Sequence, residues 1–253
     1  MLHPTKRQSE ILRAVRLHGT CPIGELAREL DVSDETIRRD VRLLVEEGMV
    51  VKVHGAIVAP DHLLEDPFQL RLQECRAEKI RIAAKAADLV EHGDSIMLDT
   101  GSTTAYVAQS LVEHRNLFAV TNSIEVARSL ANQNGNRVYM AGGEIRADDG
   151  AAFGETANAF AARFQVDKGF LSIGAISETD GFMDNELWEA EYSRVVMRQA
   201  ARVIVVADHS KFARRALVRV GGFDEVDMLI TSAPPPASLA RRLADAGVEV
   251  VIA

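Results

Sequence analysis

At 253 residues, 47% of them hydrophobic and 26% charged, the chain is long enough for two modest domains with filled cores, and its composition excludes general disorder. The net charge of −8 excludes an overall attraction to nucleic acid, although residues 1–58 hold nine Lys or Arg against nine Asp or Glu and are therefore neutral. No apolar run reaches the roughly 18 residues of a membrane span, and no apolar leader segment follows the N-terminus, which predicts a cytoplasmic protein.

The first sixty residues predict three helices and a hairpin. Ile11, Leu12 and Val15 stand at helical spacing in the first helix, which Gly19 ends. Pro22 stands where the second helix should begin, because proline is tolerated in a first helical turn.

The third expected helix follows Ser33, whose hydroxyl can accept a hydrogen bond from a first-turn N–H group. Ile37, Val41 and Leu44 fall at i, i+4 and i+7, which buries one face of a helix that ends at Gly48. Four polar side chains then face outward: Thr36, Arg38, Arg39 and Arg42. The alternating run MVVKVHGAIV comes next and predicts a small two-stranded wing.

Residues 59–78 contain two prolines and mixed charges with little period, and we interpret them as a linker. From residue 79, short apolar strands alternate with helices, which is typical of a mostly parallel α/β sheet covered on both faces. The expected strands are 95–99, 117–121, 137–141, 169–175, 202–207, 227–231 and 248–252. The expected helices are 80–90, 103–112, 123–130, 186–200 and 237–247.

The stretch LDTGSTT, at the end of the first of these strands, allows two interpretations. Asp99-Thr100-Gly101 is the signature of an aspartic protease, but that site needs two such carboxylates, and the chain has one DTG in an α/β context. The other interpretation is a strand, a tight loop and a helix start that together cradle an anion. Gly101 would let the backbone approach the ligand, and residues 102–104 would offer hydroxyl and amide groups. We favour the phosphate cradle, with simple helix capping by Ser102 or Thr103 as its structural alternative.

Other strand ends carry polar or glycine residues, and in an open α/β sheet ligands bind beyond the carboxyl ends of strands. Lys211 could close on a phosphate and Glu189 could accept hydroxyl protons, although a surface ion pair and a solvated helix face would explain them as well. The candidate effector site comprises Asp99, Thr100, Gly101, Ser102, Thr103, Thr104, Thr121, Asn122, Gly142, Gly143, Gly174, Glu189 and Lys211.

Cysteines and histidines give no sign of a metal. Cys21 and Cys75 form no CxxC pair, and no two of the seven histidines stand four residues apart. The sequence therefore indicates no disulfide framework, no metal site, no catalytic residues and no cofactor.

Several motifs in combination resemble the DeoR family of bacterial transcriptional repressors, over essentially the whole chain. They are VSDETIRRDVRLL with VKVHGA, EKIRIAAKAA, LDTGSTT, VTNS, AGGEIRADDG and DHSKF. The resemblance implies a winged helix-turn-helix DNA-binding domain at 1–58 and an effector-sensing domain at 79–253, similar to ribose-5-phosphate isomerases and CoA-transferases. It also implies that the GSTT loop holds the phosphate, with Lys211 and Glu189 near the sugar. AGGEIRADDGAAFGE and ADHSKFARRALV resemble the subgroup that regulates glycerol-3-phosphate metabolism, which implies glycerol 3-phosphate as the effector.

We therefore expect a repressor that binds double-stranded operator DNA as a homodimer or tetramer and responds to a phosphorylated sugar or polyol. The expected DNA contacts are Ser33, Thr36, Arg38, Arg39, Arg42, Lys52 and His54. The alternative is a sugar-phosphate isomerase with an accessory DNA-binding domain. An isomerase would need a companion acid for its base. Gly174, in LSIGAI, stands where the resemblance to isomerases would place that acid, which leaves Glu189 alone.

Overall fold

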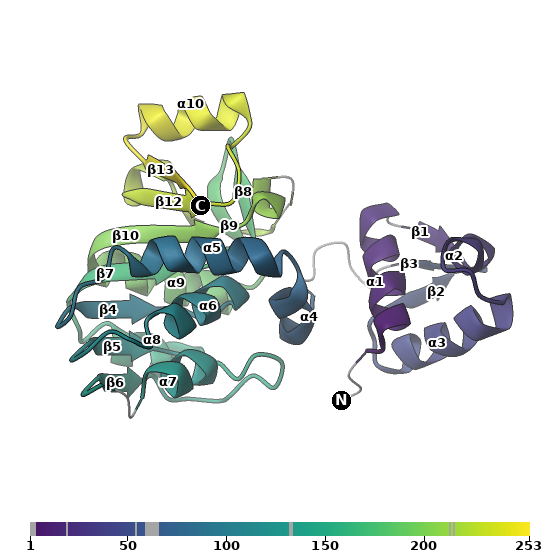
Figure 1. Ribbon diagram of the computed structural model, residues 1–253, viewed down its shortest axis with the longest axis horizontal. Helices are drawn as coiled ribbons and strands as arrows, with labels where there is room; N and C mark the ends of the chain where they lie inside the picture. Colours follow the sequence, from purple (N-terminus) through teal and green to yellow (C-terminus); the bar gives the residue numbers. More distant parts are fainter. Residues whose placement is uncertain are drawn as a thin grey trace. The chain divides into compact units, whose positions relative to one another are not determined.

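The computed structural model describes residues 4–18, 20–53, 55–58, 66–131, 134–212, 214 and 216–253. The chain folds as two compact units, residues 1–64 and 65–253, and each is considered by itself (Figure 1). None of the helices in the described ranges is long and apolar enough to cross a lipid bilayer.

Unit 1 contains three helices and a three-stranded antiparallel sheet in the order β1-β3-β2. Its elements are α1 (Lys6–His18), β1 (Thr20–Pro22), α2 (Ile23–Glu29), α3 (Asp34–Glu46), β2 (Val51–Val53) and β3 (Ala56–Val58). The helices and the hairpin confirm the expectation, but the strand β1 was missed. Pro22 ends this edge strand and is at the same time the N-cap of α2, so the sequence signal for the helix start concealed the strand before it.

Unit 2 is built on a seven-stranded, all-parallel sheet in the order β13-β12-β10-β7-β4-β5-β6, which confirms the predicted fold class (Figure 1). The strands are β4 (Ser95–Leu98), β5 (Phe118–Thr121), β6 (Arg137–Met140), β7 (Val166–Leu171), β10 (Ala200–Ala207), β12 (Met228–Thr231) and β13 (Glu249–Ile252). The chain runs from β4 outward through β5 and β6, and then returns to the other side of β4 with β7. The direction of winding therefore reverses between the neighbouring strands β4 and β7.

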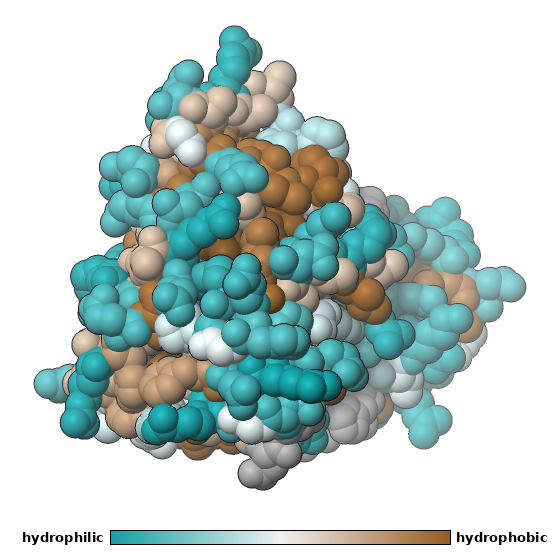
Figure 2. All heavy atoms as spheres, turned by 60° about the vertical axis from the view of Figure 1, so that its left-hand side comes forward, coloured by the Kyte–Doolittle hydropathy of each residue, from teal (hydrophilic) through white to brown (hydrophobic). Residues whose placement is uncertain are grey.

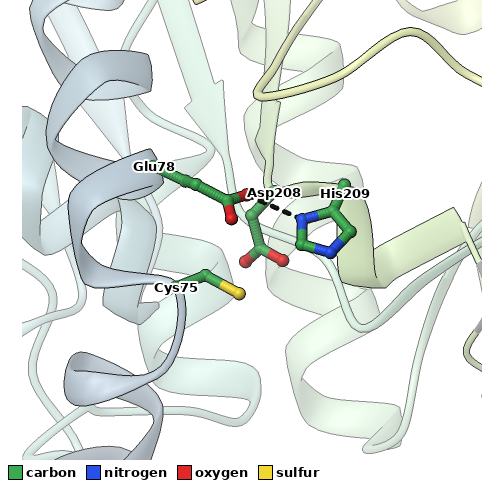
Figure 3. A group of neighbouring side chains, drawn as sticks. All are labelled: Cys75, Glu78, Asp208 and His209. Atoms are coloured by element: carbon green, nitrogen blue, oxygen red, sulfur yellow. Dashed lines mark hydrogen bonds and ion pairs between the residues drawn. The ribbon is translucent and has the colours of Figure 1, made fainter.

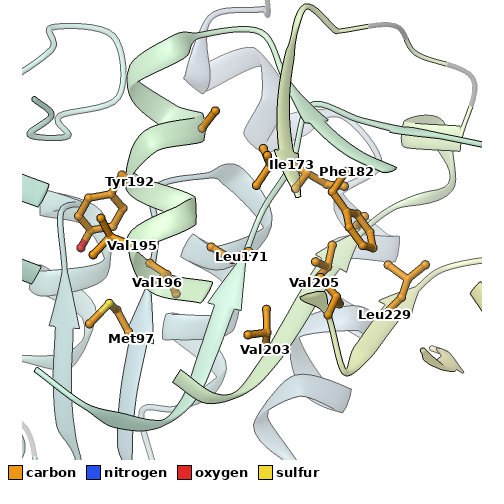
Figure 4. Close-up of a cluster of buried hydrophobic side chains, with 14 of the residues drawn as sticks. Met97, Leu171, Ile173, Phe182, Tyr192, Val195, Val196, Val203, Val205 and Leu229 are labelled. Atoms are coloured by element: carbon orange, nitrogen blue, oxygen red, sulfur yellow. The ribbon is translucent and has the colours of Figure 1, made fainter. Parts of the chain in front are cut away.

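Helices cover both faces of this sheet because successive strand residues point to opposite sides. Ile96 and Leu98 belong to one buried cluster, with α5 and α6, whereas Met97 belongs to the other, with α9 and α10. Figure 4 shows the second cluster, in which Tyr192 and Val196 of α9 lie over the sheet. The helices are α4 (Phe68–Gln73), α5 (Arg76–Ala87), α6 (Ser102–Ser110), α7 (Ile124–Leu130), α8 (Glu155–Ala161), α9 (Leu187–Gln199) and α10 (Ala237–Asp245).

The surface of the molecule is mixed. In the space-filling view a hydrophobic patch occupies the upper half of the visible face, with hydrophilic side chains around it (Figure 2). Trp188 of α9 is 52% exposed and is not a core residue.

A second, three-stranded antiparallel sheet in the order β11-β9-β8 was not expected. It consists of β8 (Ala175–Ser177), β9 (Gly181–Asp184) and β11 (Val218–Gly221), and two short 3₁₀ segments, η1 (His209–Phe212) and η2 (Phe223–Glu225), complete the unit. The expected strand 169–175 is thus two strands, since β7 ends at Leu171 and β8 begins at Ala175. The break leaves residues 172–174 at the end of the main sheet, where the site lies. Similarly, α4 and the first turn of α5 fall within the stretch 59–78 that we interpreted as a linker.

Candidate functional sites

The helix-turn-helix of unit 1 is built by two local backbone devices. Asp31, between α2 and α3, has a left-handed φ of 50°, and the N–H of Val32 bonds back to the carbonyl of Ala27 at 3.0 Å. This closes α2 and turns the chain, a conformation that a short polar residue tolerates. Ser33 then caps α3, its Oγ accepting from the Thr36 N–H at 3.3 Å, as predicted.

The outward face of α3 carries the basic side chains. Ile37, Val41 and Leu44 are buried, whereas the three candidate arginines of α3 are exposed on the other side. Arg7 of α1 pairs with the nearly buried Asp40 at 2.5 Å and fixes the inner side of α3 to the domain. Thr36 is half-buried and Ser33 and Lys52 are exposed, while His54 lies outside the described residues.

In unit 2 a polar cavity lies at the carboxyl ends of β4, β5 and β7, where the winding of the sheet reverses. Its walls come from these strand ends, from α4 and α9, and from the loop before α8. The lining residues are Arg71, Asp99, Thr100, Asn122, Phe153, Ser172, Ile173, Asp184, Glu189, Tyr192 and Ser193. Four of the predicted effector residues are therefore brought together: Asp99, Thr100, Asn122 and Glu189.

Two buried polar atoms of lining residues have no hydrogen-bond partner among the described residues. The Nδ2 of Asn122 donates to the carbonyl of Ala152 at 3.1 Å, but its Oδ1 has no hydrogen-bond partner within the described part of the chain. The same holds for the hydroxyl of Tyr192, which is 1% exposed. Burial, together with the charge of Asp99, raises the pKa of this phenol above its ordinary value, so it stays a neutral donor. Such groups are uncommon in a finished core and are natural contacts for a ligand.

The start of α6 forms the adjoining wall. Gly101 is the N-cap of α6 and has no side chain, so neither Ser102 nor Thr103 occupies the capping position that the structural alternative required. Ser102, Thr103 and Thr104 are buried, and Thr104 Oγ1 donates to the carbonyl of Gly101 at 3.2 Å. The first-turn N–H groups of a helix lack intrahelical acceptors and favour an anion.

Gly101 is packed more tightly than the sequence suggested. A Cβ on this residue would lie 2.3 Å from Ser172 Oγ and 2.5 Å from Ser172 Cβ. Its φ of 171° is extended backbone that any residue adopts. The glycine is therefore needed for the approach of β7 to the β4–α6 loop, because the backbone N–H of Ser172 donates to Asp99 Oδ2 at 2.9 Å.

A guanidinium crosses the loop side of the cavity. Arg146 bonds to both carboxylate oxygens of Asp149 and to Glu189 Oε1, and it lies 4.5 Å above the ring of Phe153. Burial acts to lower the pKa of Arg146, but the hydrogen bond to Asp149 and the charge of Glu189 outweigh it and raise that pKa. Thr100 Oγ1 also donates to Asp149, at 3.3 Å. The predicted hydroxyl acceptor Glu189 is thus held by an arginine in this state.

The remaining predicted residues surround the cavity without lining it. Thr121 accepts from the Ser123 N–H at 3.1 Å and shapes the turn into α7. Gly174 is buried where a Cβ would lie 3.1 Å from Asp184 Oδ1. Gly142 and Gly143 are exposed in the loop after β6.

Lys211 is buried in η1, beside Asp208, whose pKa its charge helps to lower. It does not line the cavity in this state, so the structure leaves its assignment to the effector site as a prediction.

The free space at the centre of the cavity is about 10 Å³, enough for roughly one water molecule. An effector larger than water must therefore widen it. Arg146 and Phe153 belong to the connection between β6 and α8 and lie outside the strands of the main sheet. The chemistry of the walls suits a polyhydroxylated anion, with carboxylates to accept hydroxyl protons and a helix N-terminus and Arg71 to hold negative charge.

Sequence reasoning missed seven of the eleven residues that line the cavity. Arg71 lay in the stretch interpreted as a linker, and Asp184 and Tyr192 lay in an unexpected strand and on the inner face of a helix. The pair Arg146 and Asp149 carried a usable signal, since opposite charges at i, i+3 in a glycine-rich loop can fold onto each other.

Comparison with known proteins finds relatives of both units. A family model described as the DeoR C terminal sensor domain matches residues 74–233, and one described as a DeoR-like helix-turn-helix domain matches residues 7–62. The glycerol-3-phosphate regulon repressor of Escherichia coli (strain K12) is 35% identical over 95% of this chain and 96% of its own. The HTH-type transcriptional repressor CsqR of the same strain is 33% identical over 97% of this chain and 94% of its own. Among solved structures, a ribose 5-phosphate isomerase A from Methanocaldococcus jannaschii superposes with a TM-score of 0.40 and 22% identity over 54% of each chain.

Proposed function

The chain belongs to the DeoR family of helix-turn-helix transcriptional regulators, and we propose that it represses transcription by binding operator DNA with an affinity that a phosphorylated sugar or polyol changes. Residues 1–58 would bind the DNA and residues 79–253 would sense the effector. Residues 59–78 would link these two domains. Its relatives are named repressors, so we propose a regulator without catalytic activity that works in the cytoplasm, where the DNA is.

The exposed basic face of α3 supports the DNA-binding part of the proposal. In helix-turn-helix proteins the second helix of the motif enters the major groove, where arginine recognises guanine edges. Arg38, Arg39 and Arg42 are exposed on α3 opposite its buried face. Ser33, Thr36 and Lys52 flank them and would contact phosphates, and His54 is assigned on the sequence alone.

Because residues 1–58 carry no net charge, one copy has little non-specific attraction to DNA. We therefore propose that the protein binds as a homodimer or tetramer, with two α3 helices on half-sites about 34 Å apart.

The polar cavity carries the effector proposal. Its single most telling feature is the presence of two buried polar atoms, Asn122 Oδ1 and the Tyr192 hydroxyl, that no described residue satisfies. A phosphate would bind at residues 101–104, near the N-terminus of α6, with Lys211 closing on it. Hydroxyl groups would reach Asn122, Tyr192 and, once Arg146 moves, Glu189. Among phosphorylated polyols we propose glycerol 3-phosphate, because a relative that matches nearly the whole chain is named for that regulon.

Effector binding would act on DNA affinity by changing how the copies are arranged. A coupling free energy of about 1–3 kcal/mol is typical of such switching and corresponds to roughly 5–150-fold in operator affinity.

The decisive experiment compares two tyrosines that each lose one hydroxyl. The Tyr192 hydroxyl has no partner in the described protein, whereas that of Tyr106 donates to the carbonyl of Leu72 at 2.9 Å, and neither Tyr106 nor Leu72 lines the cavity. We expect Tyr192→Phe to keep the free energy of unfolding within about 0.5 kcal/mol and to weaken glycerol 3-phosphate binding about 2–10-fold by calorimetry. Tyr106→Phe should lower the free energy of unfolding, because it removes a hydrogen bond, and should leave glycerol 3-phosphate binding unchanged.

Glycerol and inorganic phosphate, tested beside glycerol 3-phosphate, separate the two halves of the ligand. Tighter binding of another sugar phosphate would keep the mechanism and change the effector. The cavity would be rejected as the sensor site if none of the phosphates binds. It would also be rejected if Lys211→Ala and Tyr192→Phe both bind the phosphate as tightly as the unmodified chain does.

The isomerase alternative keeps one supporting observation, the three carboxylates of Asp99, Asp184 and Glu189 around the cavity. Glu189 is already engaged by Arg146, which makes it a poor base in this state. Turnover of a pentose or triose phosphate by the purified chain, lost in Glu189→Gln, would establish the enzyme instead.

A further inference from the structure

Outside the effector cavity, four side chains with metal-binding atoms converge where the start of α5 meets the end of β10. Cys75 is the N-cap of α5 and Glu78 lies in its first turn, whereas Asp208 and His209 follow β10 directly. One ligand atom from each lies within 4.8 Å of all the others. Figure 3 shows the thiol and the carboxylate of Asp208 facing each other, with His209 joined to Glu78.

The backbone on both segments holds these side chains in place. The N–H groups of Glu78 and Lys79 bond to the carbonyl of Cys75 at 2.9 and 3.0 Å, which ties Cys75 to the first turn of α5 beside Glu78. On the other segment, Ser210 N–H donates to Asp208 Oδ1 at 3.0 Å, which orients that carboxylate before any ligand arrives.

The four side chains face one another in two pairs. His209 Nδ1 lies 2.7 Å from Glu78 Oε2, and the Cys75 thiol is hydrogen-bonded to Asp208. A cation bound by all four side chains would replace these two contacts.

We propose that Cys75, Glu78, Asp208 and His209 form a binding site for a thiophilic divalent cation of the Zn²⁺ class. Sulfur, imidazole nitrogen and carboxylate oxygen are the donors that Zn²⁺ takes in tetrahedral protein sites, whereas Mg²⁺ and Ca²⁺ require oxygen. On binding, Cys75 loses its thiol proton to solvent and bonds through Sγ, and His209 bonds through Nδ1 with its proton on Nε2. The proposal does not rest on the proposed regulatory function, although Lys211, which acts on Asp208, is also a predicted effector residue.

The summed charge of the ligands and the neighbouring lysines indicates that a divalent cation would bind only with Cys75 as a thiolate. A thiolate and two carboxylates carry three negative charges, and the buried Lys79, 3.9 Å from Asp208 Oδ2, supplies one positive charge. The buried Lys211 also acts on Asp208 and supplies a second positive charge, so the ligands and the two lysines together carry one negative charge. The carboxylates alone are therefore a weak site for a hard cation, and the thiolate is needed to hold a divalent one.

The sequence expectation of no metal site is therefore replaced by a proposal that only the fold suggests. Glu78 and His209 are 131 positions apart, so no spacing motif connects them.

The test uses the full chain, freed of metal with a chelator, and Co²⁺ as a spectroscopic substitute for Zn²⁺. We expect one Co²⁺ per chain, with a thiolate-to-cobalt charge-transfer band that Zn²⁺ displaces and Mg²⁺ leaves unchanged. Cys75→Ser should abolish the band, because it removes the thiolate. Both Cys75→Ser and His209→Ala should weaken Zn²⁺ binding at least about tenfold. Cys21→Ser is the matched control, since Cys21 is the chain's second cysteine and lies in unit 1.

A band that survives in Cys75→Ser, or no Co²⁺ or Zn²⁺ binding at micromolar concentration, would overturn the proposal. If Cys75→Ser fails to fold, alkylation of the unmodified chain decides instead. Zn²⁺ should then protect Cys75 and not Cys21 from a thiol reagent, as read by mass spectrometry of the peptides, and equal labelling with and without Zn²⁺ would reject the site.

Discussion

Gly101 allows a direct test of what shapes the phosphate loop. The sequence suggested that this glycine lets a ligand approach the backbone, whereas the structure shows that it admits the side chain of Ser172. In Gly101→Ala the new Cβ would stand 2.3 Å from Ser172 Oγ, and ordinary contact begins at 3.4 Å, so the strand end must retreat by roughly 1 Å. Overpacking of this kind costs about 1–3 kcal/mol, and the extended φ adds no backbone strain of its own.

Two partner substitutions make the cause visible. Ser172→Ala removes the atom at 2.3 Å and keeps the one at 2.5 Å, while Ser172→Gly removes both. Combined with Gly101→Ala, the first should recover part of the lost stability and the second most of it, which gives a coupling energy of about 1–3 kcal/mol in a double-mutant cycle. Gly142→Ala is the control, because a Cβ there meets nothing within 4 Å.

Urea unfolding followed by the emission of Trp188 reports on unit 2, since the chain has one tryptophan. If the two substitutions destabilise additively, the contact is not the cause and the argument about Gly101 fails. If Gly101→Ala keeps full stability but loses effector binding, the glycine serves the ligand as the sequence suggested.

Three further predictions concern the other elements. Arg38→Ala and Arg39→Ala should each weaken operator binding by about 1–3 kcal/mol in a binding titration at fixed salt, whereas exposed Arg241→Ala on α10 should not; equal losses would mean a general charge effect. Ser33→Ala removes the cap of α3 and should lower the thermal stability of unit 1 by about 0.5–2 kcal/mol, measured by circular dichroism, with no loss contradicting the capping role. The hydroxyl and the backbone N–H of Ser95 both donate to Asp167 and hold the pKa of that carboxyl below its ordinary value. Its contribution to stability is therefore present above about pH 4 and lost as the pH falls through the lower folded pKa, so Asp167→Asn should flatten the acid side of the unfolding curve; an unchanged slope would refute this.

The sequence by itself determined the elements whose signals are local. The repeat of Ile37, Val41 and Leu44 behind Ser33 defines α3, and alternation of short apolar strands with helices defines the parallel sheet. Polar residues at strand ends correctly indicated that the site lies at the carboxyl ends of the strands, because parallel strands bring these ends to one side of the sheet. Asp99, Thr100 and Asn122 could therefore be named before the fold was known, whereas Glu189 was named from its helix and from the family resemblance.

Tertiary structure alone decided which further side chains meet there. Strand β1 and the small sheet of β8, β9 and β11 are three or four residues long and owe their existence to pairing with distant partners. Strand pairing also brings Asp184 to the cavity, and the packing of α4 and α5 on the sheet brings Arg71 to the cavity and Cys75 to His209. Periodicity reports which face of an element is buried, but it carries no information about which elements lie side by side, and a site made of residues from several elements depends on that second fact.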